Sequence, residues 1–244
     1  MADRYAVVTG VSKGLGESIA ANLLARGFQV IGLGRSAAAR LESDSFRLVV
    51  ADLADVVVLG TIVDALFDEL AARRVSSIAV INNAAIAGPA GTIGQLEVGE
   101  VVASLAVNLA APMIVANSFV RAFRLVAADR RLINVSSGAA AQPIPGGGTY
   151  NVAKAGLEML TSAIAAEQPA SGLVAVTIRP GIIDTPMQAF MRSQSAERLP
   201  ALGMFQAFHA NRQLVPPDVT AAKIVDRLVV GPIHNGRIYN YAEL

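Results

Sequence analysis

A strand, a glycine-rich turn and an amphipathic helix follow one another within the first 26 residues. The strand-like run 5–8 leads into Thr9-Gly-Val-Ser-Lys-Gly-Leu-Gly16, and an apolar-periodic stretch then continues to Ala25. Gly27 ends this stretch, and residues 28–33 again have the pattern of a strand. A strand, helix and second strand in this order form a βαβ unit, whose two strands lie parallel in one sheet. The beginning of the sequence therefore predicts an α/β fold.

The glycine turn also predicts a binding function. A helix that begins in such a turn presents free N–H groups and a partial positive charge to a phosphate group. Gly10 would allow the tight turn, while Gly14 and Gly16 would let a phosphate approach the backbone closely. The spacing is Gly-x-x-x-Gly-x-Gly and not Gly-x-Gly-x-x-Gly, and three glycines alone could be ordinary loop residues. Between a strand and a helix, they favour a dinucleotide.

The end of the second strand indicates which dinucleotide. Sites for NAD usually place Asp or Glu there to accept a hydrogen bond from the ribose 2′-hydroxyl. This chain has Gly34, Arg35 and Ser36 instead. A guanidinium group with no carboxylate beside it favours a 2′-phosphate, and Lys13 could add a second positive charge. The alternative is that both cations are solvated surface residues, but the pattern favours NADP.

Composition excludes several other classes of function. The net charge of +1 and the scattered cations do not suggest binding to nucleic acid or to an anionic membrane. The absence of cysteine excludes disulfides, thiolate nucleophiles and cysteine-ligated metals. Only His209 and His234 are present, far apart, so we expect no metal site.

The high content of hydrophobic residues, 53%, raises the question of a membrane span. The best candidate is 101–120, which carries no charge but contains Ser104, Asn108 and Pro112. These residues are too polar for a lipid-exposed segment, and a long buried helix kinked near Pro112 explains the run better. The N-terminus has a strand where a signal peptide would need its apolar stretch. We therefore expect a cytoplasmic protein.

A length of 244 residues fits one domain, 1–244, and no linker or repeat interrupts it. Apolar runs predict strands at 5–9, 28–34, 47–51, 77–82, 131–136, 173–179 and 236–241. Helices are expected at 15–26, 56–73, 97–127, 149–167 and 217–229, with an irregular segment at 182–215. The strands are apolar on both faces, as in a parallel sheet covered by helices on each side. We therefore expect a doubly wound, Rossmann-like sheet with the cofactor at its carboxyl edge.

A possible catalytic pair lies in the second half of the chain. Tyr150 and Lys154 are four residues apart, so in a helix the phenol and the ammonium share a face. A nearby cation would lower the tyrosine pKa from its reference value of about 10, which suits proton transfer to or from an alcohol. Tyr-x-x-x-Lys alone is common, and its alternative is an exposed tyrosine beside a solvated lysine.

These motifs together resemble the short-chain dehydrogenase/reductase family over essentially the full length. The matching pieces are Thr9–Gly16, Asp52-Leu53, Asn82-Asn-Ala-Ala85, Asn108, Ser137, Tyr150-x-x-x-Lys154 and Pro180-Gly181. Within the family, the chain is similar to the sepiapterin reductase and benzil reductase branch. That resemblance rests on Asn108–Ile114, Ser136–Ala140, Arg179–Gln188 and Asn235-Gly-Arg237. It implies NADPH-dependent reduction of a small-molecule ketone or 1,2-diketone.

The resemblance assigns roles residue by residue. Tyr150 would donate the proton, Ser137 would bond the same substrate oxygen, Lys154 would lower the tyrosine pKa and hold the ribose, and Asn108 would hold a water. A thirteen-residue spacing from Tyr150 selects Ser137 over Ser136, and the alternative for Asn108 is a satisfied core amide. The expected cofactor contacts are Gly10, Ser12, Lys13, Gly14, Leu15, Gly16, Arg35, Ser36, Asp52, Leu53, Asn83, Ala84, Tyr150, Lys154, Pro180, Gly181, Ile183 and Thr185.

One position departs from the family, because Ala85 stands where a glycine is usual. If that position needed a positive φ or a close approach of the cofactor, the methyl group would cost on the order of 1 kcal/mol. Residues 187–208 are rich in Met and Phe and suggest a substrate lid at about 185–215. The resemblance also implies a homodimer or tetramer through the two long helices. The alternatives are a reductase of 3-oxoacyl or sugar ketones and a non-catalytic protein that senses NADP.

Overall fold

The computed structural model describes residues 3–168 and 172–244. Seven strands form one sheet in the order β3-β2-β1-β4-β5-β6-β7, and every neighbouring pair is parallel. The strands are β1 (Asp3–Thr9), β2 (Gln29–Gly34), β3 (Phe46–Val50), β4 (Val75–Asn82), β5 (Asp129–Val135), β6 (Leu173–Arg179) and β7 (Ile238–Asn240). The predicted doubly wound α/β fold is confirmed, with strand ends shifted by one or two residues.

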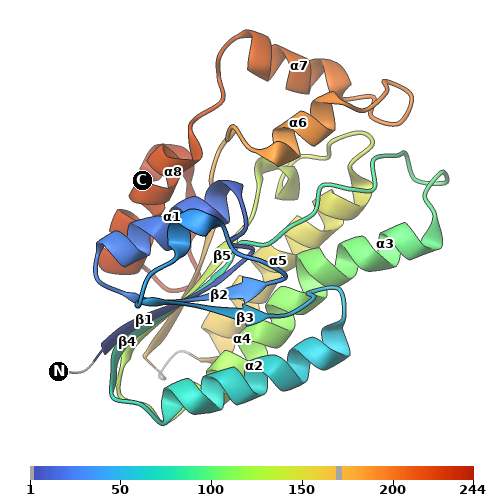
Figure 1. The fold of residues 1–244 in the computed structure, drawn as a ribbon. Coiled ribbons are helices and arrows are strands. Elements are labelled where there is room, and N and C mark those ends of the chain that lie inside the picture. Colours follow the sequence, from blue (N-terminus) through green and yellow to red (C-terminus); the bar gives the residue numbers. More distant parts are fainter. Residues whose placement is uncertain (1–2, 169–171) are drawn as a thin grey trace.

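Helices cover both faces of this sheet (Figure 1). On one face lie α1 (Gly14–Ala25) and α8 (Pro217–Ile224), which a π-helical turn extends to Val230. On the other lie α2 (Val56–Ala71), α3 (Val98–Leu105), α4 (Ala111–Phe123) and α5 (Gly148–Glu167). Buried side chains form a separate apolar core on each face, as expected for strands that are apolar on both sides.

The long helix predicted at 97–127 is present but interrupted. A π-helical turn at Ala106–Ala110 separates α3 from α4, and Pro112 then occupies the first turn of α4. By length and composition alone, the 26-residue run Val98–Phe123 could cross a membrane. It carries the buried polar residues Ser104, Asn108 and Ser118, and α4 packs extensively on α2. The run is therefore a helix of the flanking layer.

The segment 182–215, predicted to be irregular, contains two helices. These are α6 (Pro186–Arg192) and α7 (Leu202–Ala210), which lie together at one end of the molecule (Figure 1). Both are short and polar residues interrupt their apolar pattern, so periodicity did not reveal them. A small third core holds them, formed by Met191, Leu199 and Phe205 against Ala87. The prediction was wrong about their secondary structure, although this segment does fold beyond the carboxyl edge of β6.

Candidate active site

The glycine turn has the backbone conformation that the sequence predicted. Gly10 has φ of +75° and Gly14 has φ of +63°, which side chains other than glycine rarely adopt. A Cβ atom on Gly16 would lie 2.2 Å from the carbonyl oxygen of Gly10, so the helix α1 can approach the turn only at a glycine. The first turn of α1 begins at Gly14. This arrangement leaves its N–H groups free for an anion.

Thr9 joins this turn to the end of β4, a role that sequence reasoning did not assign. Its hydroxyl oxygen accepts hydrogen bonds from the backbone N–H groups of Asn83 at 3.0 Å and Ala84 at 2.9 Å. The Asn83 amide donates back to the Thr9 carbonyl at 3.0 Å. Ala85 carries no strain, because Arg212 is the one non-glycine residue with a positive φ in the described part of the chain. The cost that a positive φ would bring at this position therefore does not arise.

The side chains expected around the adenosine half are distributed between surface and core. Ser12 and Lys13 in the turn are exposed, as are Arg35 and Ser36 just after β2. The backbone N–H of Gly10 donates to Leu33 at 2.9 Å, which places the end of β2 beside the turn. Asp52 is exposed and accepts from Ala54 N–H at 2.9 Å, while Leu53 is buried and Leu15 packs in the core. The cations are therefore available to a ligand.

Ser137, Tyr150 and Lys154 come together where β5 meets α5. Ser137 precedes a short 3₁₀ turn and accepts from Ala139 N–H at 3.2 Å. The Ser137 side chain also lies close enough to the Tyr150 phenol to lower its pKa. The Lys154 ammonium lies 5.5 Å from the centre of the Tyr150 ring and donates to the Val135 carbonyl at 2.8 Å. The i, i+4 spacing thus places phenol and ammonium on one face of α5, as predicted.

The expected acidification of Tyr150 is not found. Burial raises the pKa of Tyr150 to about 12, and the neighbouring Ser137 side chain opposes this rise only in part. Burial also lowers the pKa of Lys154 to about 8. The prediction was wrong because it weighed the charge of the lysine and not the removal of the phenol from water. A phenol with a raised pKa stays protonated at neutral pH, which is the form a proton donor needs.

Asn108 is buried in the π-helical turn, with its side chain fully bonded. Its amide oxygen accepts from Ile86 N–H at 2.8 Å, and its amide nitrogen donates to the Ile86 carbonyl at 2.9 Å and to Ser104 at 3.3 Å. The side chain therefore holds the loop after β4 against the helix. This is the satisfied core amide that the sequence left open, so a water held at this position would be bound by the backbone that the π turn exposes.

The loop after β6 approaches the glycine turn. Gly181 has φ of +79°, and a Cβ atom there would lie 3.2 Å from Tyr241. Thr185 lies next to Gly14, since a Cβ atom on that glycine would be 3.4 Å from the threonine methyl group. Pro180 and Ile183 are buried. The expected nicotinamide-side and phosphate-side residues thus lie at one edge of the sheet.

A charged group next to the candidate catalytic residues was missed. Ser136 donates to the Glu158 carboxylate at 2.8 Å, and Arg179 donates to the same carboxylate at 2.8 and 2.7 Å. Glu158 raises the pKa of the Arg179 guanidinium through this pairing. The available signal was position, because Glu158 lies one helical turn after Lys154 on the buried face of α5.

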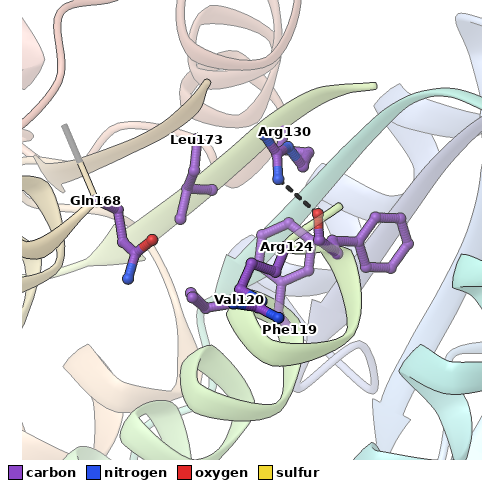
Figure 2. A pocket seen from close by; sticks show the side chains of 7 residues that line it. Phe119, Val120, Arg124, Arg130, Gln168 and Leu173 are labelled. Atoms are coloured by element: carbon purple, nitrogen blue, oxygen red, sulfur yellow. Dashed lines mark hydrogen bonds between the residues drawn. The ribbon is translucent and has the colours of Figure 1, made fainter. Parts of the chain in front are cut away.

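A small, partly open pocket elsewhere does not compete with this site. It lies at the amino ends of β5 and β6, where Arg130 reaches the carbonyl oxygen at the end of α4 (Figure 2). Its volume is about 10 Å³, which is room for one water. Within residues 3–168 and 172–244, no group of three or more His, Asp or Glu side chains could hold a metal ion.

Comparison with known proteins gives the family. The family described as short chain dehydrogenase matches residues 4–196. Benzil reductase ((S)-benzoin forming) from Bacillus cereus is 32% identical over 248 residues, covering 98% of this chain and 100% of that enzyme. Sepiapterin reductase from Meriones unguiculatus is 29% identical over 247 residues, covering 94% and 93%. The solved structure of the KRED1-Pglu enzyme is 30% identical, with a TM-score of 0.84 over 96% of this chain and 99% of that one.

These similarities extend over nearly the whole chain and agree in sequence and in fold. The expected resemblance to benzil and sepiapterin reductases is confirmed at the level of relatives. The protein therefore belongs to the short-chain dehydrogenase family and is an oxidoreductase that acts on carbonyl or CH–OH groups.

Proposed function

We propose that the protein is an NADPH-dependent carbonyl reductase that reduces a ketone or 1,2-diketone, with Tyr150 as the proton donor. The observation that carries this proposal is the Lys154 ammonium 5.5 Å from the Tyr150 ring, with Ser137 near the phenol, at the sheet edge that also holds the glycine turn. The benzil reductase relative supports the substrate class.

The residues at this edge fit a dinucleotide. The N-terminus of α1 and the glycines that lack a Cβ leave space and free N–H groups for a pyrophosphate. Arg35, Lys13, Ser12 and Ser36 would hold a 2′-phosphate, because all four are exposed beside the turn. The remaining proposed contacts are Leu15, Asp52, Leu53, Asn83, Ala84, Pro180, Gly181, Ile183 and Thr185. When bound, NADPH supplies a hydride to the carbonyl carbon.

The chain's own residues handle the oxygen and the proton. Ser137 donates a hydrogen bond to the carbonyl oxygen, which stabilises the negative charge that develops there. Tyr150 is protonated at neutral pH and gives its proton to the same oxygen. Lys154 lies against the ring of Tyr150, where its positive charge stabilises the phenolate that remains. Asn108 holds the loop after β4 in place.

The segment 185–215 serves as the substrate lid in this proposal. Its inner side chains Met191, Leu199 and Phe205 pack against Ala87, which follows β4 at the same edge. Phe190 is 40% exposed at the rim. Apolar side chains above a polar catalytic centre suit an aromatic or diketone substrate.

The direct test is NADPH consumption with a panel of 1,2-diketones, 3-oxoacyl thioesters and sugar ketones. We expect turnover of benzil-like diketones and formation of one enantiomer of the hydroxyketone. Turnover of only the 3-oxoacyl or sugar compounds would favour the more general reductase. Tight NADPH binding without consumption by any carbonyl would favour the sensor and contradict the proposed activity.

The cofactor assignment is tested at Arg35. Arg35→Ala removes the charge proposed to pair with the 2′-phosphate, so the Kd for NADPH should rise by about 10- to 100-fold. The Kd for NADH should stay within about twofold, because NADH has no 2′-phosphate. Equal losses for both nucleotides would contradict the assignment.

We also propose a cytoplasmic homodimer, with a tetramer as the alternative. Along α5, Val152 and Met159 are 62% and 69% exposed, and Met113 of α4 is 51% exposed. This unpartnered apolar surface suits a second copy of the chain. Sedimentation should give a dimer, and Met159→Glu should shift it to a monomer. A monomeric wild-type protein at micromolar concentration would contradict this proposal.

A further inference from the structure

A charge pair lies directly behind the catalytic residues. The Arg179 guanidinium donates twice to the Glu158 carboxylate, at 2.8 and 2.7 Å, and the Ser136 hydroxyl adds a third bond at 2.8 Å. Glu158 is 9% exposed. A carboxylate taken from water in this way is stable only because its partners satisfy its oxygens.

The pair connects the three elements that carry the proposed chemistry. Ser136 follows β5 and directly precedes Ser137, and its hydroxyl also reaches the Lys154 carbonyl at 3.4 Å. Glu158 belongs to α5, one turn after Lys154. Arg179 ends β6, immediately before the Pro180-Gly181 turn. A single carboxylate thus ties the serine, the tyrosine–lysine helix and the loop after β6 to one another.

Because Arg179 pairs with Glu158, the Lys154 ammonium has a different partner. Glu158 and Lys154 are separated by four residues, the spacing at which a carboxylate and an ammonium normally pair on a helix. Here the Lys154 ammonium instead donates to Val135 at 2.8 Å, and Arg179 occupies the carboxylate. The lysine thereby stays against the Tyr150 ring.

We propose that Glu158 is a positioning residue: clamped by Arg179, it fixes Ser136 and through it Ser137, relative to Tyr150 and Lys154. This inference rests on the proposed carbonyl reduction. A purely structural role is a weaker explanation, because apolar residues of similar volume stabilise a fold at least as well as a buried ion pair. Apolar residues at these positions would not accept the hydrogen bond that orients the Ser136 hydroxyl.

The chain offers a more exposed control of the same composition on α2 and α4, where the Asp64 side chain is 39% exposed and that of Glu158 is 11% exposed. Asp64 accepts from Ser118 and pairs with Arg121, so it repeats the set of serine, carboxylate and arginine. This group lies between flanking helices and contacts none of the candidate catalytic residues. Asp64→Asn therefore reports how much stability is lost when such a group is weakened at a place where catalysis is not affected.

The experiment compares the double variant Glu158→Met/Arg179→Met with Glu158→Gln, Ser136→Ala and Asp64→Asn. Each is assayed with benzil for kcat and KM, by fluorescence for the Kd of NADPH, and by thermal melting for folding. The double variant should fold but lose kcat by about 10- to 100-fold, with KM and the Kd of NADPH within about twofold of wild type. Ser136→Ala should show a smaller loss of the same kind.

Glu158→Gln keeps the shape and one acceptor oxygen for Ser136, so it should retain most of the turnover. Asp64→Asn should leave kcat unchanged. A folded double variant with the wild-type kcat would overturn the inference, as would a loss of kcat in Asp64→Asn equal to that of the double variant.

Crystals of wild type and double variant with NADP⁺ give a readout independent of turnover. Displacement of the Ser137 hydroxyl from Tyr150 in the double variant supports the inference, whereas identical placement overturns it. If the wild type reduced no carbonyl, the proposed function would fail, and this structural comparison would still decide the role of Glu158.

Discussion

The two halves of the sheet edge are built by different means. On the nucleotide side, β1, α1 and β2 form the turn mainly with backbone groups, and the essential feature is a missing Cβ at Gly16. On the catalytic side, β5, α5 and β6 converge through buried side chains such as Lys154 and Glu158. A site formed by backbone groups reduces the free energy of unfolding little when no ligand is bound. Buried ionisable groups reduce it more, because they must be removed from water. The catalytic side should therefore be the less stable part, and its stability should depend more strongly on pH and on substitution of its side chains.

The largest expected effect tests the catalytic side. Tyr150→Phe removes the proposed proton donor and keeps the ring, so kcat should fall by about 10²- to 10⁴-fold. The Kd for NADPH, set mainly on the other side, should change by less than about twofold. Stopped-flow consumption and fluorescence titration measure the two quantities separately. A variant that retained substantial turnover would contradict the role of Tyr150 as proton donor. It would also contradict the separation of nucleotide binding and proton transfer between the two sides of the edge.

The next prediction concerns the free energy of unfolding that is lost by burying the Lys154 ammonium. Burial lowers the pKa of Lys154 from 10.5 to about 8, so the unfolded chain binds more protons between these pH values. Stability should therefore rise with pH in this window, since the penalty for burying the charge disappears as the lysine loses its proton. The gap of about 2.5 between the two pKa values corresponds to about 3 kcal/mol.

Lys154→Met carries no such penalty. The difference in free energy of unfolding, variant minus wild type, should be largest at pH 7. It should decrease by about 3 kcal/mol by pH 10.5. Urea titrations of both proteins at several pH values give this difference directly. A difference that did not vary with pH would mean that the ammonium is hydrated, and the contrast between the two halves would disappear.

The same contrast explains what the sequence could predict. Backbone demands leave clear signals, because positive φ and close approach select glycine, and long apolar runs select buried strands. The positions of the strands along the chain, the glycine turn and the face shared by Tyr150 and Lys154 followed from such signals.

Side-chain environments left weaker signals. The direction of the Tyr150 pKa depends on burial by residues distant in sequence, and the link between Glu158 and Arg179 spans 21 residues. Helices α6 and α7 are short, and contacts with Ala87 in another loop stabilise them. These features depend on tertiary contacts, which neither propensity nor spacing encodes.

A smaller effect is expected on the nucleotide side. Gly16→Ala places a Cβ 2.2 Å from the Gly10 oxygen and 2.3 Å from the Asn83 amide, so the turn must shift. The free energy of unfolding should fall by about 2 kcal/mol, and the Kd for NADPH should rise. Denaturant titration and fluorescence binding test both. Unchanged affinity would show that the close approach of α1 is not what forms the site.

The smallest effect should have the opposite sign. Gly203 lies in the first turn of α7, with no atom within 4 Å of a Cβ placed there, and its φ is not positive. Gly203→Ala should therefore stabilise the protein by about 0.5–1 kcal/mol, because alanine loses less backbone entropy in a helix. NADPH affinity should not change, which makes this variant the control for Gly16→Ala. If α7 opens to admit substrate, the same substitution should slow turnover slightly by favouring the folded lid, and a kcat equal to wild type would indicate that lid opening leaves α7 intact.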